Sequence, residues 1–125
     1  MTLTPITITW DTTDPEPLAA WWAEQTGARV TATNDGWFVV VQGGNLPLQL
    51  AFQKVPDPTP GKNRLHLDLT TSDVDAEVDR LVAAGASIVG HRNAGDFQWV
   101  TLADPQGNEF CVAPAHEPAE AYDTA

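Results

Sequence analysis

A histidine and an aspartate share one face of a short leucine-rich segment, RLHLDL, at residues 64–69. Side chains of a strand project alternately to its two faces, so His66, Asp68 and Thr70 lie on one face and the leucines on the other. An imidazole beside a carboxylate can bind a polar ligand, exchange a proton or ligate a metal ion. The rise of a strand sets Asp68 about 6 to 7 Å beyond His66, which disfavours a metal ion held by both.

The segment EFCVA, at residues 109–113, offers a second pair of polar groups. Phe110 and Val112 predict a face that packs on a core, which places Glu109 and Cys111 on the opposite face. Imidazole, carboxylate and thiolate together are a natural ligand set for zinc. Each of these side chains can equally hydrogen-bond a ligand, and a cysteine on a strand is often a packing residue. The residue types alone leave these alternatives open.

Three further residues belong to the same polar face by the same alternation. Thr7 alternates with isoleucines in PITITW, and Gln49 lies between leucines in PLQLAF. Trp99 alternates with Val100 and offers a ring on which a flat or cationic ligand could stack. These three residues join the candidate ligand contacts.

An internal repeat organises the chain. The segment TITWDTTDPEPLAAWWAEQTGA, from Thr7, and the segment HLDLTTSDVDAEVDRLVAAGA, from His66, each contain a strand, an aspartate, a helical pattern and Gly-Ala. Asp14 and Asp73 are predicted helix N-caps, and a glycine marks the end of each helix. Each copy therefore begins with a strand and an amphipathic helix.

Three strand-like runs follow each helix, separated by turn signals such as NDG, GGN, NAGD and DPQGN. Each half therefore reads β-α-β-β-β. The first module spans about residues 5–53, a proline-rich linker 53–63, and the second module about 64–113, within one domain at 1–113. A flexible acidic tail is predicted at 114–125. The runs are at 29–33, 37–42 and 47–52 in the first module, and at 86–90, 97–102 and 109–113 in the second.

Charge and composition exclude several classes of function. Six basic and seventeen acidic residues give a formal net charge of -11, which repels the phosphate backbone of nucleic acid. The same field favours a cationic ligand. No apolar run approaches the roughly 20 residues that span a bilayer, and the N-terminus carries no export signal. With a single cysteine, these features predict a cytoplasmic protein without a membrane or nucleic-acid partner.

The two β-α-β-β-β modules, with RLHLDL opening the second and LADPQGNEFCV closing it, resemble the vicinal oxygen chelate superfamily of glyoxalase-like, bleomycin-resistance and extradiol dioxygenase proteins. The resemblance implies an α+β fold in which tandem βαβββ modules form a cup-shaped mixed sheet with the helices outside, and a homodimer. It also implies metal ligands on the opening and closing strands of each module. The matching positions are Thr7, Ala51, His66 and Cys111, or Gln49 and Glu109 for the closing strands.

Only His66 matches the metal pattern of that superfamily. We therefore expect a cup that binds a small molecule, cationic or aromatic, for sequestration or resistance, without a catalytic metal or other cofactor. The alternative is a divalent-metal-dependent lyase, isomerase or dioxygenase in which His66 acts with Glu109 or Cys111. No catalytic residue is assigned. The predicted cup residues are Thr7, Gln49, His66, Asp68, Trp99, Glu109 and Cys111.

Overall fold

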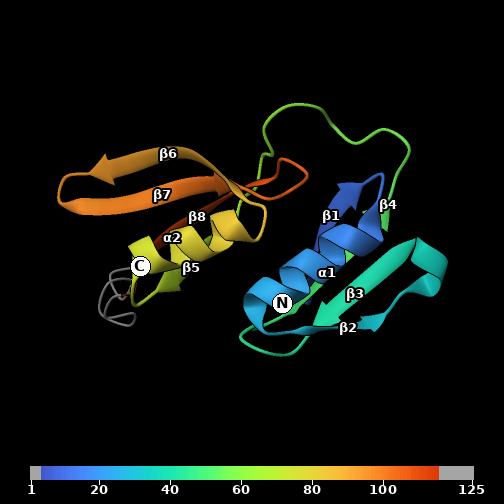
Figure 1. Cartoon of the computed structure of the whole chain (residues 1–125). Helices are drawn as coiled ribbons and strands as arrows, with labels where there is room; N and C mark the ends of the chain where they lie inside the picture. Colours follow the sequence, from blue (N-terminus) through green and yellow to red (C-terminus); the bar gives the residue numbers. More distant parts are fainter. Residues whose placement is uncertain (1–3, 116–125) are drawn as a thin grey trace. The chain divides into compact units, whose positions relative to one another are not determined.

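The computed structural model describes residues 4–115 and divides the chain into two compact units, one ending at Thr59 and one beginning at Pro60. Each unit holds one helix and four strands (Figure 1). The first contains β1 (Thr7–Thr12), α1 (Pro15–Thr26), β2 (Arg29–Ala32), the 3-10 turn η1 (Asn34–Gly36), β3 (Phe38–Gln42) and β4 (Gln49–Lys54). The second contains β5 (Asp68–Thr71), α2 (Val74–Ala83), β6 (Ser87–Ala94), β7 (Phe97–Ala103) and β8 (Glu109–Pro114).

The two units have the same topology. The sheet order is β1-β4-β3-β2 in the first and β5-β8-β7-β6 in the second. In each sheet the opening strand pairs parallel with the closing strand, and the other pairs are antiparallel. This arrangement confirms the predicted α+β fold with two βαβββ modules. None of the helices in the part of the chain described is long and apolar enough to cross a membrane.

The helices begin and end where their sequence signals predict. Helix α1 has Asp14 at its N-cap and ends at Gly27, whose positive φ of 69° suits a residue without a Cβ. In α2 the Asp73 carboxylate accepts a hydrogen bond from the backbone N–H of Ala76, at 3.1 Å. Asp14 makes no such side-chain cap, and Pro15 at the first helical position supplies the alternative start signal.

Each module has its own apolar core between its helix and one face of its sheet. Helix α1 contacts β2, β3 and β4, and helix α2 contacts β5, β6 and β8. Burial of these side chains is the main favourable contribution to folding. The cores consist of Leu18, Trp22, Val39, Val41, Leu50 and Phe52 in the first module, and of Val78, Leu81, Val100, Leu102, Phe110 and Val112 in the second.

The opening strand of the second module is shorter than its sequence pattern predicts. Strand β5 begins at Asp68, so His66 precedes it, and Leu65 is 87% exposed and contributes nothing to the predicted apolar face. The Asn63 side chain explains the departure, because its amide donates to the carbonyl oxygens of Leu65 and Glu109, at 2.6 and 3.0 Å. These bonds hold the chain in an irregular conformation before the strand.

Strand ends also differ from the predicted module limits. Strand β4 runs to Lys54, into the predicted linker, and strand β6 continues to Ala94. At the C-terminal end, β8 includes Pro114, and the backbone N–H of Ala115 donates to the carbonyl oxygen of Thr71. The remainder of the predicted tail, residues 116–125, lies outside the described residues.

Candidate functional site

The seven predicted cup residues fall into two groups, one in each module. Thr7 and Gln49 are directly opposite each other on β1 and β4, where the Gln49 amide donates to the Thr7 hydroxyl at 2.7 Å. The other five lie in the second module: His66, Asp68, Trp99, Glu109 and Cys111. That all seven line a single cup stays a prediction.

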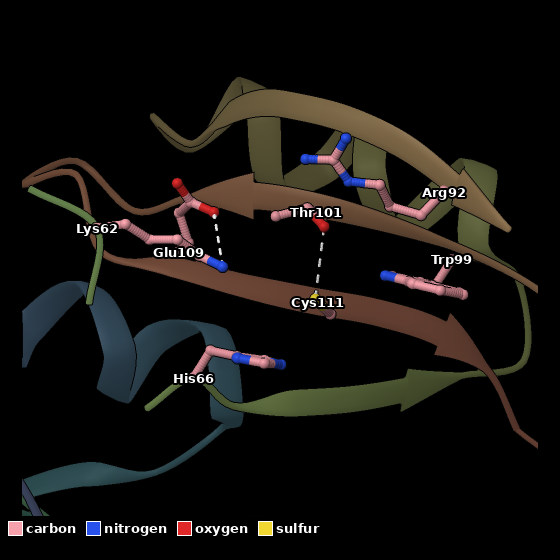
Figure 2. A pocket seen from close by; sticks show the side chains of 7 residues that line it. All are labelled: Lys62, His66, Arg92, Trp99, Thr101, Glu109 and Cys111. Carbon is pink, nitrogen blue, oxygen red and sulfur yellow. Dashed lines mark hydrogen bonds and ion pairs between the residues drawn. The ribbon is translucent and has the colours of Figure 1, made fainter. Parts of the chain in front are cut away.

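A pocket in the second module brings four of these five together. Its volume is about 220 Å³, and it lies on the face of β6, β7 and β8 opposite the core, beside the segment that precedes β5 (Figure 2). Polar, charged and aromatic groups all contribute to its wall. The side chains that line it are Lys62, His66, Arg92, Trp99, Thr101, Glu109 and Cys111.

Two of the pocket residues, Thr101 and Cys111, belong to a row of residues that pair directly across the strands. Gly90 on β6 is opposite Thr101, Thr101 is opposite Cys111, and Cys111 is opposite Asp68. Residues paired in this way project to the same face of a sheet. The Thr101 hydroxyl and the Cys111 thiol are 3.5 Å apart and share a hydrogen bond, while Phe110 and Val112 are buried on the other face. The alternation predicted for β8 is therefore confirmed.

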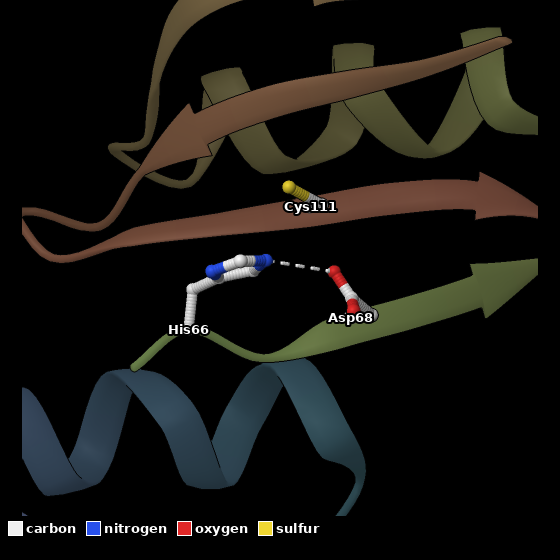
Figure 3. A group of neighbouring side chains, drawn as sticks. All are labelled: His66, Asp68 and Cys111. Carbon is white, nitrogen blue, oxygen red and sulfur yellow. Dashed lines mark ion pairs between the residues drawn. The ribbon is translucent and has the colours of Figure 1, made fainter. Parts of the chain in front are cut away.

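The His66 side chain contacts the Asp68 side chain. Nε2 of the imidazole is 3.2 Å from Oδ1 of Asp68, and the two side chains face each other beside Cys111 (Figure 3). The 6 to 7 Å expectation concerned the rise along the backbone, and the two side chains bridge that spacing by turning toward each other. A carboxylate that orients an imidazole leaves the second ring nitrogen available to a ligand.

Two residues at the end of the predicted linker contact Glu109. Lys62 Nζ lies 4.0 Å from the Glu109 carboxylate. Asn63 accepts a hydrogen bond from the backbone N–H of Glu109 at 2.8 Å and also donates to its carbonyl oxygen. Sequence reasoning missed both, because a segment with three prolines gives no pattern from which a contact with β8 follows.

Arg92 and Thr101 also line the pocket and were not among the predicted cup residues. The predicted strand ended at Gly90, which left Arg92 in a turn, whereas β6 pairs with β7 as far as Ala94 and Phe97. The length of the partner strand β7 could have predicted that β6 extends beyond Gly90. The seven residues Phe97–Ala103 require a partner of similar length on the other side of the turn NAGD.

A family model for the glyoxalase-like domain matches residues 7–113. The chain belongs to the glyoxalase-like domain family. It is thereby a member of the vicinal oxygen chelate superfamily, as the repeat and the closing turn indicated. No curated protein sequence matches the chain significantly.

Solved structures share the fold of this glyoxalase-like chain at low sequence identity. A glyoxalase/bleomycin resistance protein/dioxygenase family enzyme from Burkholderia phytofirmans is 18% identical, with 88% of this chain and 97% of that chain covered and a TM-score of 0.71. Lactoylglutathione lyase from Agrobacterium tumefaciens is 15% identical, with coverages of 92% and 96% and a TM-score of 0.66. A fosfomycin resistance protein from Listeria monocytogenes, complexed with Mn(II), is 14% identical, with full coverage of both chains and a TM-score of 0.77.

The glyoxalase-like chain lacks the metal ligands that the superfamily resemblance implies for the first module. Thr7 accepts the Gln49 hydrogen bond, and Ala51 is fully buried and has no donor atom. The structural equivalents of Asp68 and Cys111 are Thr9 and Ala51, which pair in the same parallel register. The first module therefore supplies no strong metal donor at these positions.

The second module does hold three donors whose chemistry suits a metal ion. Each of His66, Asp68 and Cys111 offers one ligand atom, and these three atoms lie within 4.8 Å of one another. Tetrahedral zinc, with ligand bonds of about 2.0 to 2.3 Å, sets its donors about 3.3 to 3.8 Å apart. The set of nitrogen, oxygen and sulfur donors fits zinc chemically. To bind the ion, the three side chains would have to move slightly closer together. Asp68, at 74% exposed, has the freedom to move but is not preorganised.

Proposed function

We propose that this glyoxalase-like chain binds a small molecule in the pocket of its second module and does so without a catalytic metal. The observation that carries the proposal is the pocket itself, in which Trp99, His66 and Cys111 converge from three separate segments of the chain. A concave surface with an aromatic side and a few converging polar groups is the usual form of a ligand site. Its volume of about 220 Å³ suits a small ligand.

Each of the pocket residues contributes a different interaction with the ligand. Trp99 is half-buried, so its ring offers a surface for stacking while its position stays fixed. Asp68 orients the His66 imidazole toward hydrogen bonding with a ligand. Glu109 is paired with Lys62, which leaves its carboxylate charge partly balanced before any ligand binds. The arrangement supports sequestration of a compound, the resistance-like role that the superfamily resemblance suggests.

A fragment screen of the full chain, made in the presence of a chelator, tests this function. We expect hits to shift the Trp99 indole N–H and the backbone amide signals of Thr101 and Cys111 in two-dimensional NMR spectra. His66→Ala should weaken these hits by about 1 to 2 kcal/mol, the scale of one hydrogen bond left unmade. The variant His91→Ala is the matched control, because His91 is on β6 but does not line the pocket.

His91→Ala should leave the affinities unchanged. Two results would count against the proposal: hits that perturb only other surfaces, or equal losses in His66→Ala and His91→Ala. Hits that appear only when the chelator is left out would instead favour a metal-dependent site.

A second candidate function is a divalent-metal-dependent lyase, isomerase or dioxygenase. The donor cluster of His66, Asp68 and Cys111 favours it, as does the Mn(II) complex of the structurally similar fosfomycin resistance protein. When bound, the metal would polarise an oxygen atom of the substrate. The three side chains would hold the ion, and the neighbouring Trp99 and Thr101 would position the substrate.

The partners and location proposed with this function follow from the sequence. A net charge of -11 argues against nucleic acid, and the single cysteine suits a reducing cytoplasm. A homodimer is proposed on the superfamily resemblance. Of the paired tryptophans of α1, only Trp21 retains exposed surface for such a contact, because Trp22 is 1% exposed.

A further inference from the structure

The guanidinium group of Arg92 is seated over Gly90, two residues earlier on the same face of β6. A Cβ atom at position 90 would lie 2.7 Å from Nη1 and 2.9 Å from Cζ of Arg92, closer than such atoms approach. The missing side chain of Gly90 therefore makes the space that the guanidinium occupies. Figure 2 shows the Arg92 side chain running back along β6 so that its charged end lies on the Thr101 side of the pocket.

Two cations of the second module, Lys62 and Arg80, have a carboxylate partner, whereas Arg92 has none among the described residues. Lys62 is paired with Glu109, and Arg80 forms an ion pair with Glu77 on α2. Within residues 4–115, Arg92 makes no ion pair. Glu109 also lines the pocket but is paired with Lys62, so the Arg92 guanidinium is available to a ligand.

Trp99 lies directly across from Arg92 in the β6–β7 pairing, so both side chains belong to the pocket face. The Trp99 ring is tilted against Phe97, with ring centroids 5.8 Å apart. A ligand with a flat apolar part against Trp99 would thus carry its polar end toward the guanidinium. Arginine donates its hydrogen bonds as a planar fork, which matches the two oxygens of a carboxylate or phosphate.

We propose that the pocket selects ligands that carry an oxyanion, a carboxylate or a phosphate, on a flat apolar body, with Arg92 binding the anion and Trp99 the flat part. This inference rests on the proposed binding function and names its ligand class. It reverses the preference for a cation that the net charge of the whole chain favours. The reversal is physically reasonable because a neighbouring charge acts far more strongly than distant charges screened by salt.

The test compares four naphthalene probes by NMR titration of the full chain: 2-naphthoate, 2-naphthyl phosphate, the neutral 2-naphthamide and the cationic 2-naphthylmethylammonium. We expect one or both anions to bind about tenfold more tightly than the amide, as charge-assisted hydrogen bonds allow. The stronger of the two anions then identifies the oxyanion. Arg92→Gln should reduce the affinity of the anions to that of the amide and leave the amide unchanged.

Two matched variants separate the effect of the position of the guanidinium from the effect of its charge. Gly90→Ala keeps the charge but displaces the guanidinium, and it should weaken anion binding about threefold to tenfold. Arg80→Gln removes the same charge from α2, on the core side of the sheet, and should have no effect. Binding of the amide or the ammonium probe as tightly as the anions, or unchanged anion binding in Arg92→Gln, overturns the inference while the binding function stands. No binding of any probe at this face overturns both.

Discussion

Replacing Trp22 by alanine should lower the free energy of unfolding by about 3 to 5 kcal/mol, the range for removing a large aromatic side chain from a core. Trp22 is 1% exposed and lies at the centre of an aromatic cluster in the first module. Its ring centroid is 5.6 Å from that of Trp10 and 5.0 Å from that of Trp21. Trp10 in turn stacks on Phe52 at 4.9 Å, so the cavity would open in the middle of the cluster.

The adjacent tryptophan is the matched control for this prediction. Trp21 has the same size and lies on the same helix, but it is only half-buried. Trp21→Ala should therefore cost less than half as much as Trp22→Ala, since it leaves a notch at the surface and no closed cavity. Urea unfolding followed by far-ultraviolet circular dichroism measures both variants without relying on tryptophan fluorescence. Equal losses would show that the core has been assigned wrongly.

The second large effect is expected at Asp104, in the turn that leads into β8. Asp104 is 3% exposed, and its Oδ1 accepts the backbone N–H groups of Gln106 and Asn108 at 2.9 and 3.0 Å. Its Oδ2 accepts from the Asn108 side-chain amide at 3.0 Å. Asp104→Ala leaves these donors without their acceptor and should cost about 2 to 4 kcal/mol of stability.

The variant Asp104→Asn keeps the volume of the side chain and changes only its hydrogen bonds. Asp104→Asn keeps one acceptor oxygen for the two backbone donors and replaces the other by a second donor facing Asn108. We expect about half the loss of Asp104→Ala, measured by thermal and urea unfolding of both variants. Because β8 begins at Glu109, directly after this turn, both variants should also broaden the NMR signals of Cys111. A loss under about 0.5 kcal/mol for Asp104→Ala would contradict the account.

The elements of the fold could be predicted because local signals agree with the packing. The alternation in EFCVA identified Phe110 and Val112 as core residues, and both are buried. An aspartate before each helix and a glycine after it predicted the helix ends to within two residues. The internal repeat predicted the same order of elements in both halves, and the two sheets have the same strand order.

The details of the site were less predictable because they depend on contacts distant in sequence. The hydrogen bonds of Asn63 to Glu109 join positions 46 residues apart, and His66 lies in the segment between Asn63 and the start of β5. Strand periodicity contains no information about such a contact. Arg92 was missed for a related reason, because the length of β6 is set by its pairing with β7 and not by its own composition.

The central claim is that the second-module pocket works without a catalytic metal, and calorimetric titration of the metal-free chain with zinc tests it most directly. The donors of His66, Asp68 and Cys111 lie up to 4.8 Å apart, and the first module adds no strong ligand at the equivalent positions. We therefore predict that zinc binds no more tightly than micromolar, with similar weak heats for wild type and His66→Ala. Stoichiometric submicromolar binding by wild type that disappears in His66→Ala would contradict the account and establish the metalloenzyme alternative.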